Sequence, residues 1–206
     1  MKQEPASAPE QSMRERKRNE TRERIVRAGV ELFASKGYDE TTVADIAAAA
    51  DIGTRTFFGY FAGKDALLFG AGSSRTELAV RIIGEAAPDE QPARVLLRAL
   101  DEASTDSDED LVNERAVLRL RLVGSVPAVR ARGALAQLEG VKAIGDALLT
   151  RFPALDAAQA SGLAGAFVGA SAAAVQTVLL DATAGTPAER AARIHSAVAA
   201  GLGVVE

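Results

Sequence analysis

The stretch from residue 43 to residue 61, VADIAAAADIGTRTFFGYF, decides the fold of the region around it. Apolar residues recur at helical spacing in two short groups, over 43–50 and 54–61. The sequence Asp51-Ile52-Gly53 separates them and is typical of a turn. The pattern predicts a helix-turn-helix, with Ala47 as the small residue at the helix crossing. The apolar side chains expected between the helices are Ile46, Ala50, Ile52, Phe57 and Phe61.

The second of these helices is expected to turn a mixed polar and aromatic face outward, made of Thr54, Arg55, Thr56, Phe58 and Tyr60. Such a face suits phosphates and base edges. Arg55 is the main candidate for reading a base, because its guanidinium can fork onto guanine O6 and N7. The alternative for Arg55 is a surface ion pair with Asp51. Thr54 and Thr56 can donate to phosphates or contact thymine methyl groups.

The residues before this stretch support it. A helix from Arg14 carries an apolar stripe, and Gly37 is expected to end it, because glycine accepts the left-handed conformation common at helix ends. Thr42 is predicted to cap the next helix, and Asp45, three residues on, completes an acidic version of the capping box. A helix, a cap and a helix-turn-helix therefore follow one another within a short distance.

Composition excludes several classes of site. Of the 206 residues, 48% are hydrophobic and 25% charged, as in an ordinary soluble protein with a sizeable core. The absence of cysteine excludes disulfides, thiolate zinc sites and cysteine nucleophiles. A single histidine, His195, excludes a histidine metal cluster. We therefore expect no metal site. We also expect no cofactor, and a function other than catalysis.

The charge is unevenly distributed. The net charge is −4, yet residues 14–30 hold seven Arg or Lys against three Glu. A basic segment on a mildly acidic chain is typical of a small DNA-binding module joined to a larger domain. The first four basic residues of this segment are Arg14, Arg16, Lys17 and Arg18. They are candidates for an arm that follows the DNA backbone or minor groove, and a solvent-exposed run of charges is an equally good interpretation.

The chain as a whole is predicted to be all-α, because strand and hairpin signals are absent. We expect a disordered tail over 1–13, a DNA-binding domain over 14–63 and a larger helical domain over 64–206. No secretory signal is visible, so a cytoplasmic location is expected. The uncharged stretch 157–180 is rich in Ala, Gly and Ser, which favours a buried or interfacial helix over a membrane span.

The N-terminal region closely resembles the DNA-binding domain of TetR-family transcriptional regulators. The resemblance covers about residues 20–69. It rests on Leu32-Phe33, Lys36-Gly37-Tyr38, Thr41-Thr42-Val43, Asp45-Ile46-Ala47, Ala50, Ile52, Thr56-Phe57, Phe61, Lys64-Asp65 and Leu67. The segment RTFFGYF, residues 55–61, is most similar to the corresponding segment of regulators of the mycofactocin or acyl-CoA-responsive type.

The resemblance implies roles for particular residues, and the chain departs from the family pattern at some of them. Asp51 stands where the turn glycine is usual, and Gly53 replaces the usual serine cap. Phe58 replaces a tyrosine that commonly reaches a phosphate, and Gly59 lacks a side chain that often adds a backbone contact. Tyr60, Lys64 and Thr42 are then the expected phosphate contacts.

The resemblance also implies a homodimer with an unknown small-molecule effector in its second domain. Arg115, Arg119 and Arg121 lie on an otherwise apolar helix, where they would meet an acidic ligand group or pair with neighbouring carboxylates. Phe152, Phe167 and Gln176 would line the pocket or fill a core. A four-helix dimer interface is expected from small residues and an amphipathic last helix: Gly162, Gly165, Gly169, Ile194, Val198 and Leu202.

The resulting hypothesis is a homodimeric transcriptional repressor that leaves a palindromic double-stranded operator when an effector binds, with no membrane partner. Two alternatives remain open. One is an enzyme on a helical scaffold, although no nucleophile–base pair or phosphate loop is visible. The other is a helical ligand-carrying or protein-binding module whose DNA binding has been lost through Asp51, Phe58 and Gly59.

Overall fold

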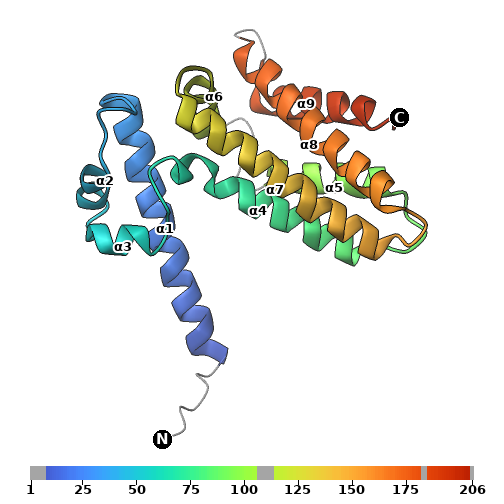
Figure 1. Cartoon of the computed structure of the whole chain (residues 1–206), viewed down its shortest axis with the longest axis horizontal. Helices are drawn as coiled ribbons and strands as arrows, with labels where there is room; N and C mark the ends of the chain where they lie inside the picture. Colours follow the sequence, from blue (N-terminus) through green and yellow to red (C-terminus); the bar gives the residue numbers. More distant parts are fainter. Residues whose placement is uncertain (1–7, 106–113, 182–184, 205–206) are drawn as a thin grey trace, which may run out of the picture. The chain divides into compact units, whose positions relative to one another are not determined.

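A computed structural model of the chain describes residues 8–105, 114–181 and 185–204. Within these ranges the secondary structure consists of nine α-helices, and no described residue lies in a strand (Figure 1). The chain divides into two compact units, Met1–Leu68 and Phe69–Glu206. The all-α prediction is therefore confirmed. The division falls five residues later than the sequence suggests, so Lys64 belongs to the first unit.

The first unit holds α1 (Ala8–Ser35), α2 (Val43–Ala49), α3 (Thr54–Phe58) and the first turn of α4 (Ala66–Glu85). Figure 1 shows α2 and α3 beside the C-terminal half of α1. The predicted apolar positions form the core: Ile46, Ala50 and Phe57 are fully buried and Ala47 is 1% exposed. Ile25, Phe33, Phe61, Leu67 and Leu68 close the same core from α1 and from the segment after α3. Burying each large apolar side chain contributes about 1.5–3 kcal/mol.

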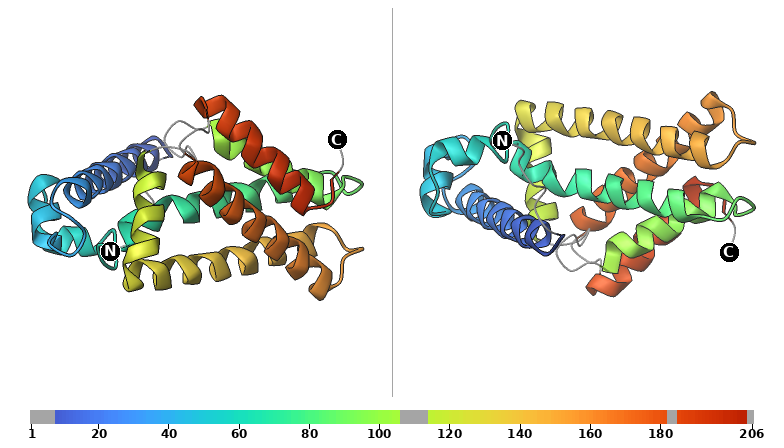
Figure 2. Two further views of the ribbon diagram at one scale, coloured as in Figure 1. Left: turned by 90° about the horizontal axis from the view of Figure 1, so that it is seen from above. Right: turned by 90° about the horizontal axis from the view of Figure 1, so that it is seen from below.

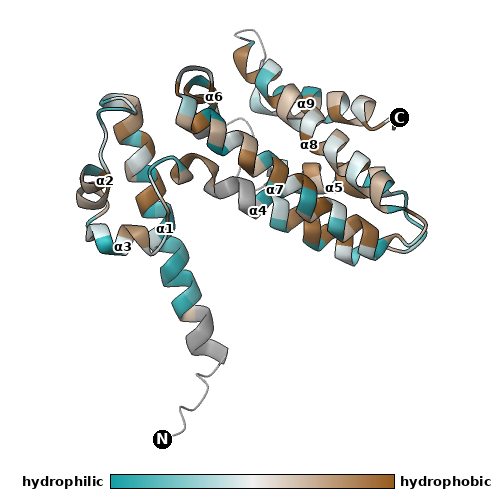
Figure 3. Ribbon diagram, in the orientation of Figure 1, coloured by the Kyte–Doolittle hydropathy of each residue, from teal (hydrophilic) through white to brown (hydrophobic). Residues whose placement is uncertain are grey.

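The N-terminal half of α1 differs from its predicted form. The helix begins at Ala8, so residues 8–13 are helical rather than a disordered tail, while 1–7 lie outside the described residues. Every residue from Met13 to Glu20 is exposed, and Figure 3 shows the hydrophilic character of this half of the helix. Thus α1 has a packed C-terminal half and an exposed, charged N-terminal half.

The turn between α2 and α3 has the geometry that its sequence predicts. Asp51 has φ 52°, in the left-handed region that favours glycine, and it is the one non-glycine residue with positive φ among the described residues. Gly53 precedes α3 and makes no side-chain cap. Both departures from the family pattern therefore have the structural consequence that the sequence suggests.

The second unit continues α4 and adds five helices: α5 (Pro92–Thr105), α6 (Glu114–Ser125), α7 (Pro127–Arg151), α8 (Ala157–Leu180) and α9 (Pro187–Gly201). One apolar cluster joins α4, α5, α7, α8 and α9 through residues such as Ile83, Leu96, Leu148, Phe167 and Val198. The two views of Figure 2 show α8 running beside both α7 and α9. Small residues allow this packing, since a Cβ on Gly201 would lie 2.9 Å from Ala170 Cβ.

Helix α8 is long and apolar enough to cross a membrane by length and composition, yet 28% of its most apolar window is buried in this unit. Its N-terminus carries a complete capping box, in which Asp156 Oδ1 accepts from Gln159 N at 2.8 Å and Gln159 Oε1 accepts from Asp156 N at 2.9 Å. One side of α8 packs on α7 and α9, and the other side leaves small and apolar residues exposed.

Candidate DNA-binding surface and ligand cavity

The outward face of α3 is formed as the sequence predicts. Thr54, Arg55, Thr56 and Phe58 are exposed, whereas the buried Phe57 anchors the helix from the other side. Tyr60 follows the helix and is only half-buried. Two hydroxyls and one guanidinium are thereby presented together on one short helix, a set that can contact phosphates and base edges.

Thr42 caps α2 as predicted and is exposed. Its Oγ1 accepts from Asp45 N at 3.1 Å, and Asp45 Oδ2 accepts from Thr42 N at 2.9 Å. The hydroxyl proton of Thr42 remains to donate to a phosphate at this helix N-terminus. Lys36 Nζ donates to the same Asp45 oxygen at 2.7 Å, which ties the end of α1 to the start of α2.

Asp45 makes the stability of this corner depend on pH. The hydrogen bond from Lys36, followed by those from Thr42, holds the pKa of Asp45 well below its usual range. A carboxyl group with a lowered folded-state pKa stabilises the fold above its unfolded pKa and loses this contribution as pH falls towards the folded value. We expect the unfolding temperature to fall between about pH 5 and about pH 3. This fall should be smaller in Asp45→Asn than in the unaltered protein, as thermal melts would show; an equal fall would contradict the assignment.

Lys64 lies differently from the phosphate contact that the family resemblance implies. Its Nζ donates to the carbonyl oxygens of Tyr38, at 2.6 Å, Thr41, at 2.9 Å, and Asp39, at 3.3 Å. The same ammonium lies 4.3 Å from the centroid of the Tyr38 ring. Three donors thus meet three carbonyls, so a phosphate would have to displace one of them. Lys64 fastens the loop between α1 and α2 to the start of α4.

The loop that Lys64 holds is itself closely packed. Thr41 is fully buried, and its Oγ1 donates to Gly37 O at 2.6 Å. The Tyr38 ring packs on Phe33 with centroids 5.0 Å apart. Burial raises the pKa of Tyr38, with Asp65 and Asp39 adding to the effect, so its phenol stays neutral beneath the ammonium. This loop leads directly into Thr42, so the clamp positions the start of α2.

The second unit contains a cavity of about 390 Å³ between α4, α5, α6, α7 and α8. Cavities of this size are typical of small-molecule sites. Part of the wall belongs to the apolar core, through residues such as Ala79, Leu100, Ile144 and Phe167. Gly133 lets Phe69 approach α7, because a Cβ there would lie 3.2 Å from Phe69 Cε1.

The charged residues of the described wall are all cationic. Arg75, Arg119 and Arg130 line the cavity, and no Asp or Glu is among its described lining residues. Arg130 also donates to the Val123 and Gly124 carbonyls, at 3.1 and 2.7 Å, and so caps the end of α6. Ser171 Oγ is buried in the wall and has no hydrogen-bond partner among the described residues. The cavity is therefore suited to a ligand with an apolar body and an acidic group.

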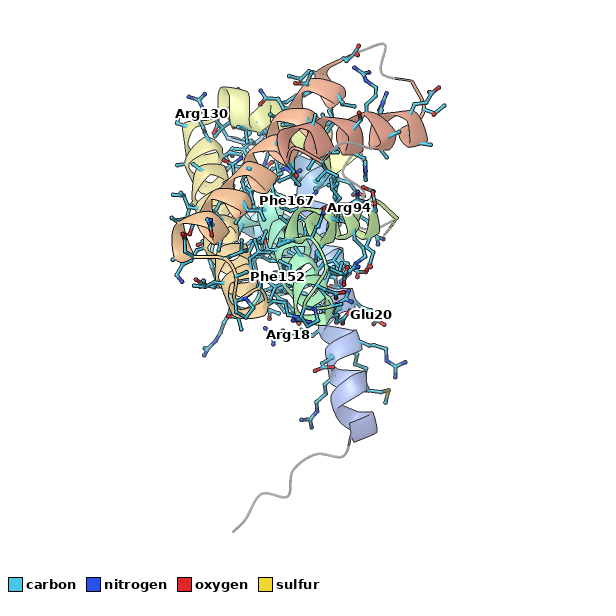
Figure 4. The ribbon with its side chains drawn as sticks, turned by 90° about the vertical axis from the view of Figure 1, so that its right-hand side faces the viewer. Arg18, Glu20, Arg94, Arg130, Phe152 and Phe167 are labelled. Atoms are coloured by element: carbon cyan, nitrogen blue, oxygen red, sulfur yellow. The ribbon has the colours of Figure 1, made fainter. Side chains whose placement is uncertain are left out.

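The predicted pocket residues divide into three groups. Arg119, Phe167 and Gln176 line the cavity, Phe152 is 4% exposed in the core, and the side chain of Arg115 lies outside the described part of the chain. Figure 4 shows Phe152 and Phe167 among the helices of the second unit and Arg130 near the start of α7. Sequence reasoning missed Arg75, Arg130 and Ser171. Arg75 had the signal that identified Arg119, a cation within an apolar helix, but Ser171 had none.

The residues predicted at the dimer interface fall into two groups. Ile194 and Val198 are 1% and 0% exposed and pack in the core of their own chain, and Leu202 packs partly against it. The assignment of Ile194 and Val198 to a dimer interface was therefore wrong, because the apolar face of α9 meets α5 and α8. The assignment of Leu202, which is only partly buried, stays a prediction. By contrast, a Cβ on Gly162, Gly165 or Gly169 would meet nothing within 4 Å among the described residues. The α8 face that carries these glycines is open to a second helix.

Comparisons with known proteins support the helix-turn-helix of the first unit. Residues 25–71 match the sequence model of "Bacterial regulatory proteins, tetR family". The DNA-binding region of this chain, residues 25–71, is therefore of the TetR type. It is 45% identical over 53 residues to the transcriptional regulator TcmR of Streptomyces glaucescens, covering 26% of this chain and 24% of TcmR. It is also 30% identical over 123 residues to the putative mycofactocin biosynthesis regulator MftR of Mycobacterium tuberculosis, covering 60% of this chain and 61% of MftR.

The likeness in fold to solved TetR-family structures extends over most of the chain, beyond the DNA-binding region. The structure of Thermus thermophilus FadR, a TetR-family repressor in complex with lauroyl-CoA, matches with a TM-score of 0.54 and 22% identity, covering 90% of this chain and 95% of FadR. The sequence matches, however, span about a quarter and about three-fifths of the TcmR and MftR chains. The family model itself matches the DNA-binding region, over residues 25–71.

Proposed function

We propose that this TetR-family protein is a homodimeric, ligand-responsive repressor that acts in the cytoplasm on a palindromic operator. The observation that carries the proposal is the helix-turn-helix, whose exposed α3 face presents Thr54, Arg55 and Thr56 above a core of Ile46, Ala47 and Phe57. Arg55 would read a base edge. Thr42, Thr54 and Thr56 would contact phosphates, and the exposed basic half of α1 would follow the backbone.

The proposed dimer uses the open face of α8. Exposed positions recur there at helical spacing, and they are small or apolar: Ala158, Gly162, Ala166, Gly169, Ala173, Thr177 and Leu180. Small residues let two helices approach closely. Leu180, 63% exposed in the single chain, would be covered by a second copy. A symmetric dimer would place two α3 helices about one DNA turn apart, over two half-sites.

The proposed effector is an amphiphilic acid, and acyl thioesters of coenzyme A are the first candidates. The arginines and the apolar wall of the cavity suit an acidic group and an alkyl chain, and FadR of Thermus thermophilus is a fold neighbour with lauroyl-CoA bound. Release from DNA would follow if the ligand prefers the form that binds DNA poorly. By linkage, operator DNA would weaken ligand binding by the same factor.

The test of DNA binding is selection of sequences from a random duplex pool by the full-length protein, followed by titration at several salt concentrations. We expect a palindromic consensus and an affinity that falls steeply with salt. Binding without sequence preference, or no binding, would contradict the regulator. If lauroyl-CoA nevertheless bound in the cavity, the result would favour the ligand-carrying alternative.

Ser171→Ala is expected to act in opposite directions on stability and on ligand binding. An unsatisfied buried hydroxyl costs about 1–3 kcal/mol. Removing it should therefore raise the unfolding temperature of the ligand-free protein, by about 2–4 °C per kcal/mol. If the hydroxyl binds the effector, affinity for lauroyl-CoA should fall about five- to tenfold. Calorimetry measures the affinity for lauroyl-CoA and thermal melts measure the unfolding temperature. Ser161→Ala, an exposed serine on the same helix, is the control and should change neither. Unchanged affinity would remove Ser171 from the ligand site.

A further inference from the structure

Phe58 is a large apolar side chain on a surface that is otherwise polar. It lies at the end of α3 and is 58% exposed. Among the described residues, it is the one aromatic side chain in the group of large hydrophobic residues that remain exposed. It follows Thr54 by four residues and Arg55 by three, so the three side chains share one face of the helix. Phe58 therefore belongs to the face that the proposed function turns towards DNA.

The orientation of the Phe58 ring is set by its neighbour. The rings of Phe57 and Phe58 meet edge to face, with centroids 5.5 Å apart and planes at 87°. Phe57 is fully buried and packs in turn on Phe61, with centroids 5.8 Å apart. A contact between aromatic rings in this geometry is favourable beyond the area it buries. The exposed ring thus rests on a rigid support, which reduces the entropy lost when it meets a partner.

The chemistry of phenylalanine limits what this ring can recognise. It has no hydrogen-bond donor or acceptor, so placing it against a phosphate or a polar base edge would remove water without replacing the lost hydrogen bonds. The major groove has one apolar group on its base edges, the C5 methyl of thymine. We propose that Phe58 selects thymine in the operator by packing against this methyl group. The inference rests on the proposed DNA binding and adds to it the base that Phe58 reads.

The spacing on α3 also constrains where this thymine lies. Three residues of helix advance about 4.5 Å along the axis, and successive bases along a DNA strand are about 3.4 Å apart. Arg55, which suits guanine, and Phe58 would then address base pairs that are adjacent or separated by one pair. Each half-site should contain a G·C pair and an A·T pair at this separation.

The experiment replaces thymine by deoxyuridine, which keeps base pairing and lacks the methyl group. The full-length protein first selects its operator from a random duplex pool, and each thymine of the selected site is then replaced in turn, in one half-site and in both. Burial of one methyl-sized group corresponds to about a fourfold change in affinity. We expect a loss of about fourfold in one half-site and about fifteenfold in both, at one thymine position only.

Variants of Phe58 link that loss to the side chain. Phe58→Ala should bind the unmodified operator more weakly and should no longer distinguish thymine from deoxyuridine at this position. Phe58→Tyr, which keeps the ring, should still distinguish them. Phe58→Tyr keeps the ring contact with Phe57, so its thermal melt should match that of the unaltered protein, whereas Phe58→Ala loses this contact and should melt at a slightly lower temperature. Thr150→Ala, exposed on α7 and outside both the DNA-binding surface and the proposed dimer face, is the control with unchanged discrimination.

The outcomes separate this inference from the proposed function. Specific DNA binding with no sensitivity to deoxyuridine at any thymine would overturn the role of Phe58 and leave the regulator intact. Sensitivity that persists in Phe58→Ala would overturn it as well, because another side chain would then contact the methyl group. Failure to select any sequence would overturn the proposed DNA binding, and the role of Phe58 with it.

Discussion

Arg55→Ala is expected to abolish most sequence-specific binding while leaving non-specific binding nearly intact. A bidentate contact from arginine to guanine contributes about 1–3 kcal/mol of discrimination. A dimer makes it twice, so the loss on a palindrome should be roughly 30-fold to 10⁴-fold in affinity. Arg55 is exposed, so its replacement should leave the unfolding temperature unchanged.

The measurement is a pair of titrations, on the selected operator and on an unrelated duplex of the same length. Arg81→Ala, an exposed arginine of α4 beside Glu85 in the second unit, serves as the matched control and should change neither affinity. Arg55→Lys should recover little specificity, because a single ammonium cannot reproduce the fork. Equal losses on both duplexes would show that Arg55 contacts phosphate rather than a base.

Lys64→Met is expected to weaken DNA binding by loosening the first unit rather than by removing a phosphate contact. Methionine keeps the apolar stem and removes the ammonium that holds the Tyr38, Asp39 and Thr41 carbonyls. Hydrogen bonds from charged groups contribute about 1.5–3 kcal/mol each, and bonds that share one ammonium are not additive. We expect a loss of about 2 kcal/mol in stability, or about 4–8 °C in unfolding temperature. Amide exchange should rise over residues 38–42.

The salt dependence of DNA binding decides between the two roles of Lys64. A phosphate contact changes the slope of log affinity against log salt by about 0.9, or about 2 for the dimer. If Lys64 is a clamp, Lys64→Met should lower affinity without changing this slope. The matched control is Arg18→Met in the exposed half of α1, labelled in Figure 4, which should reduce the slope and leave the unfolding temperature unchanged. A reduced slope with unchanged stability for Lys64→Met would restore its role as a phosphate ligand.

Local patterns in the sequence were sufficient to predict the helix-turn-helix. Thr42 and Asp45 are three residues apart, so their reciprocal cap is visible from spacing alone, and the structure confirms it. The apolar positions 46, 47, 50 and 57 predicted a core because helical spacing places them on shared faces. The substitution of Asp51 for glycine predicted a left-handed residue, and φ is 52° there.

The packing of the helices in the second unit could not be predicted from such local patterns. Its cavity is lined by residues from five helices, and Ser171, one of the most informative among them, is an ordinary helical serine in the sequence. The apolar stripe of α9 predicted a buried face correctly, but not what covers it. An apolar face has the same pattern whether it packs on its own chain or on a second copy, so Ile194 and Val198 were assigned to the wrong partner.

The sequence by itself determined the class of fold, the helix-turn-helix and the side chains on its outward face. These follow from residues within one or two turns of each other, and local spacing records which face of a helix is apolar. Only the tertiary structure decided the part that Lys64 plays, the cationic wall of the cavity and the open face of α8. The Lys64 contacts join residues 23 to 26 positions apart. Contacts of this kind depend on how helices pack, which the spacing of residues along one helix does not record.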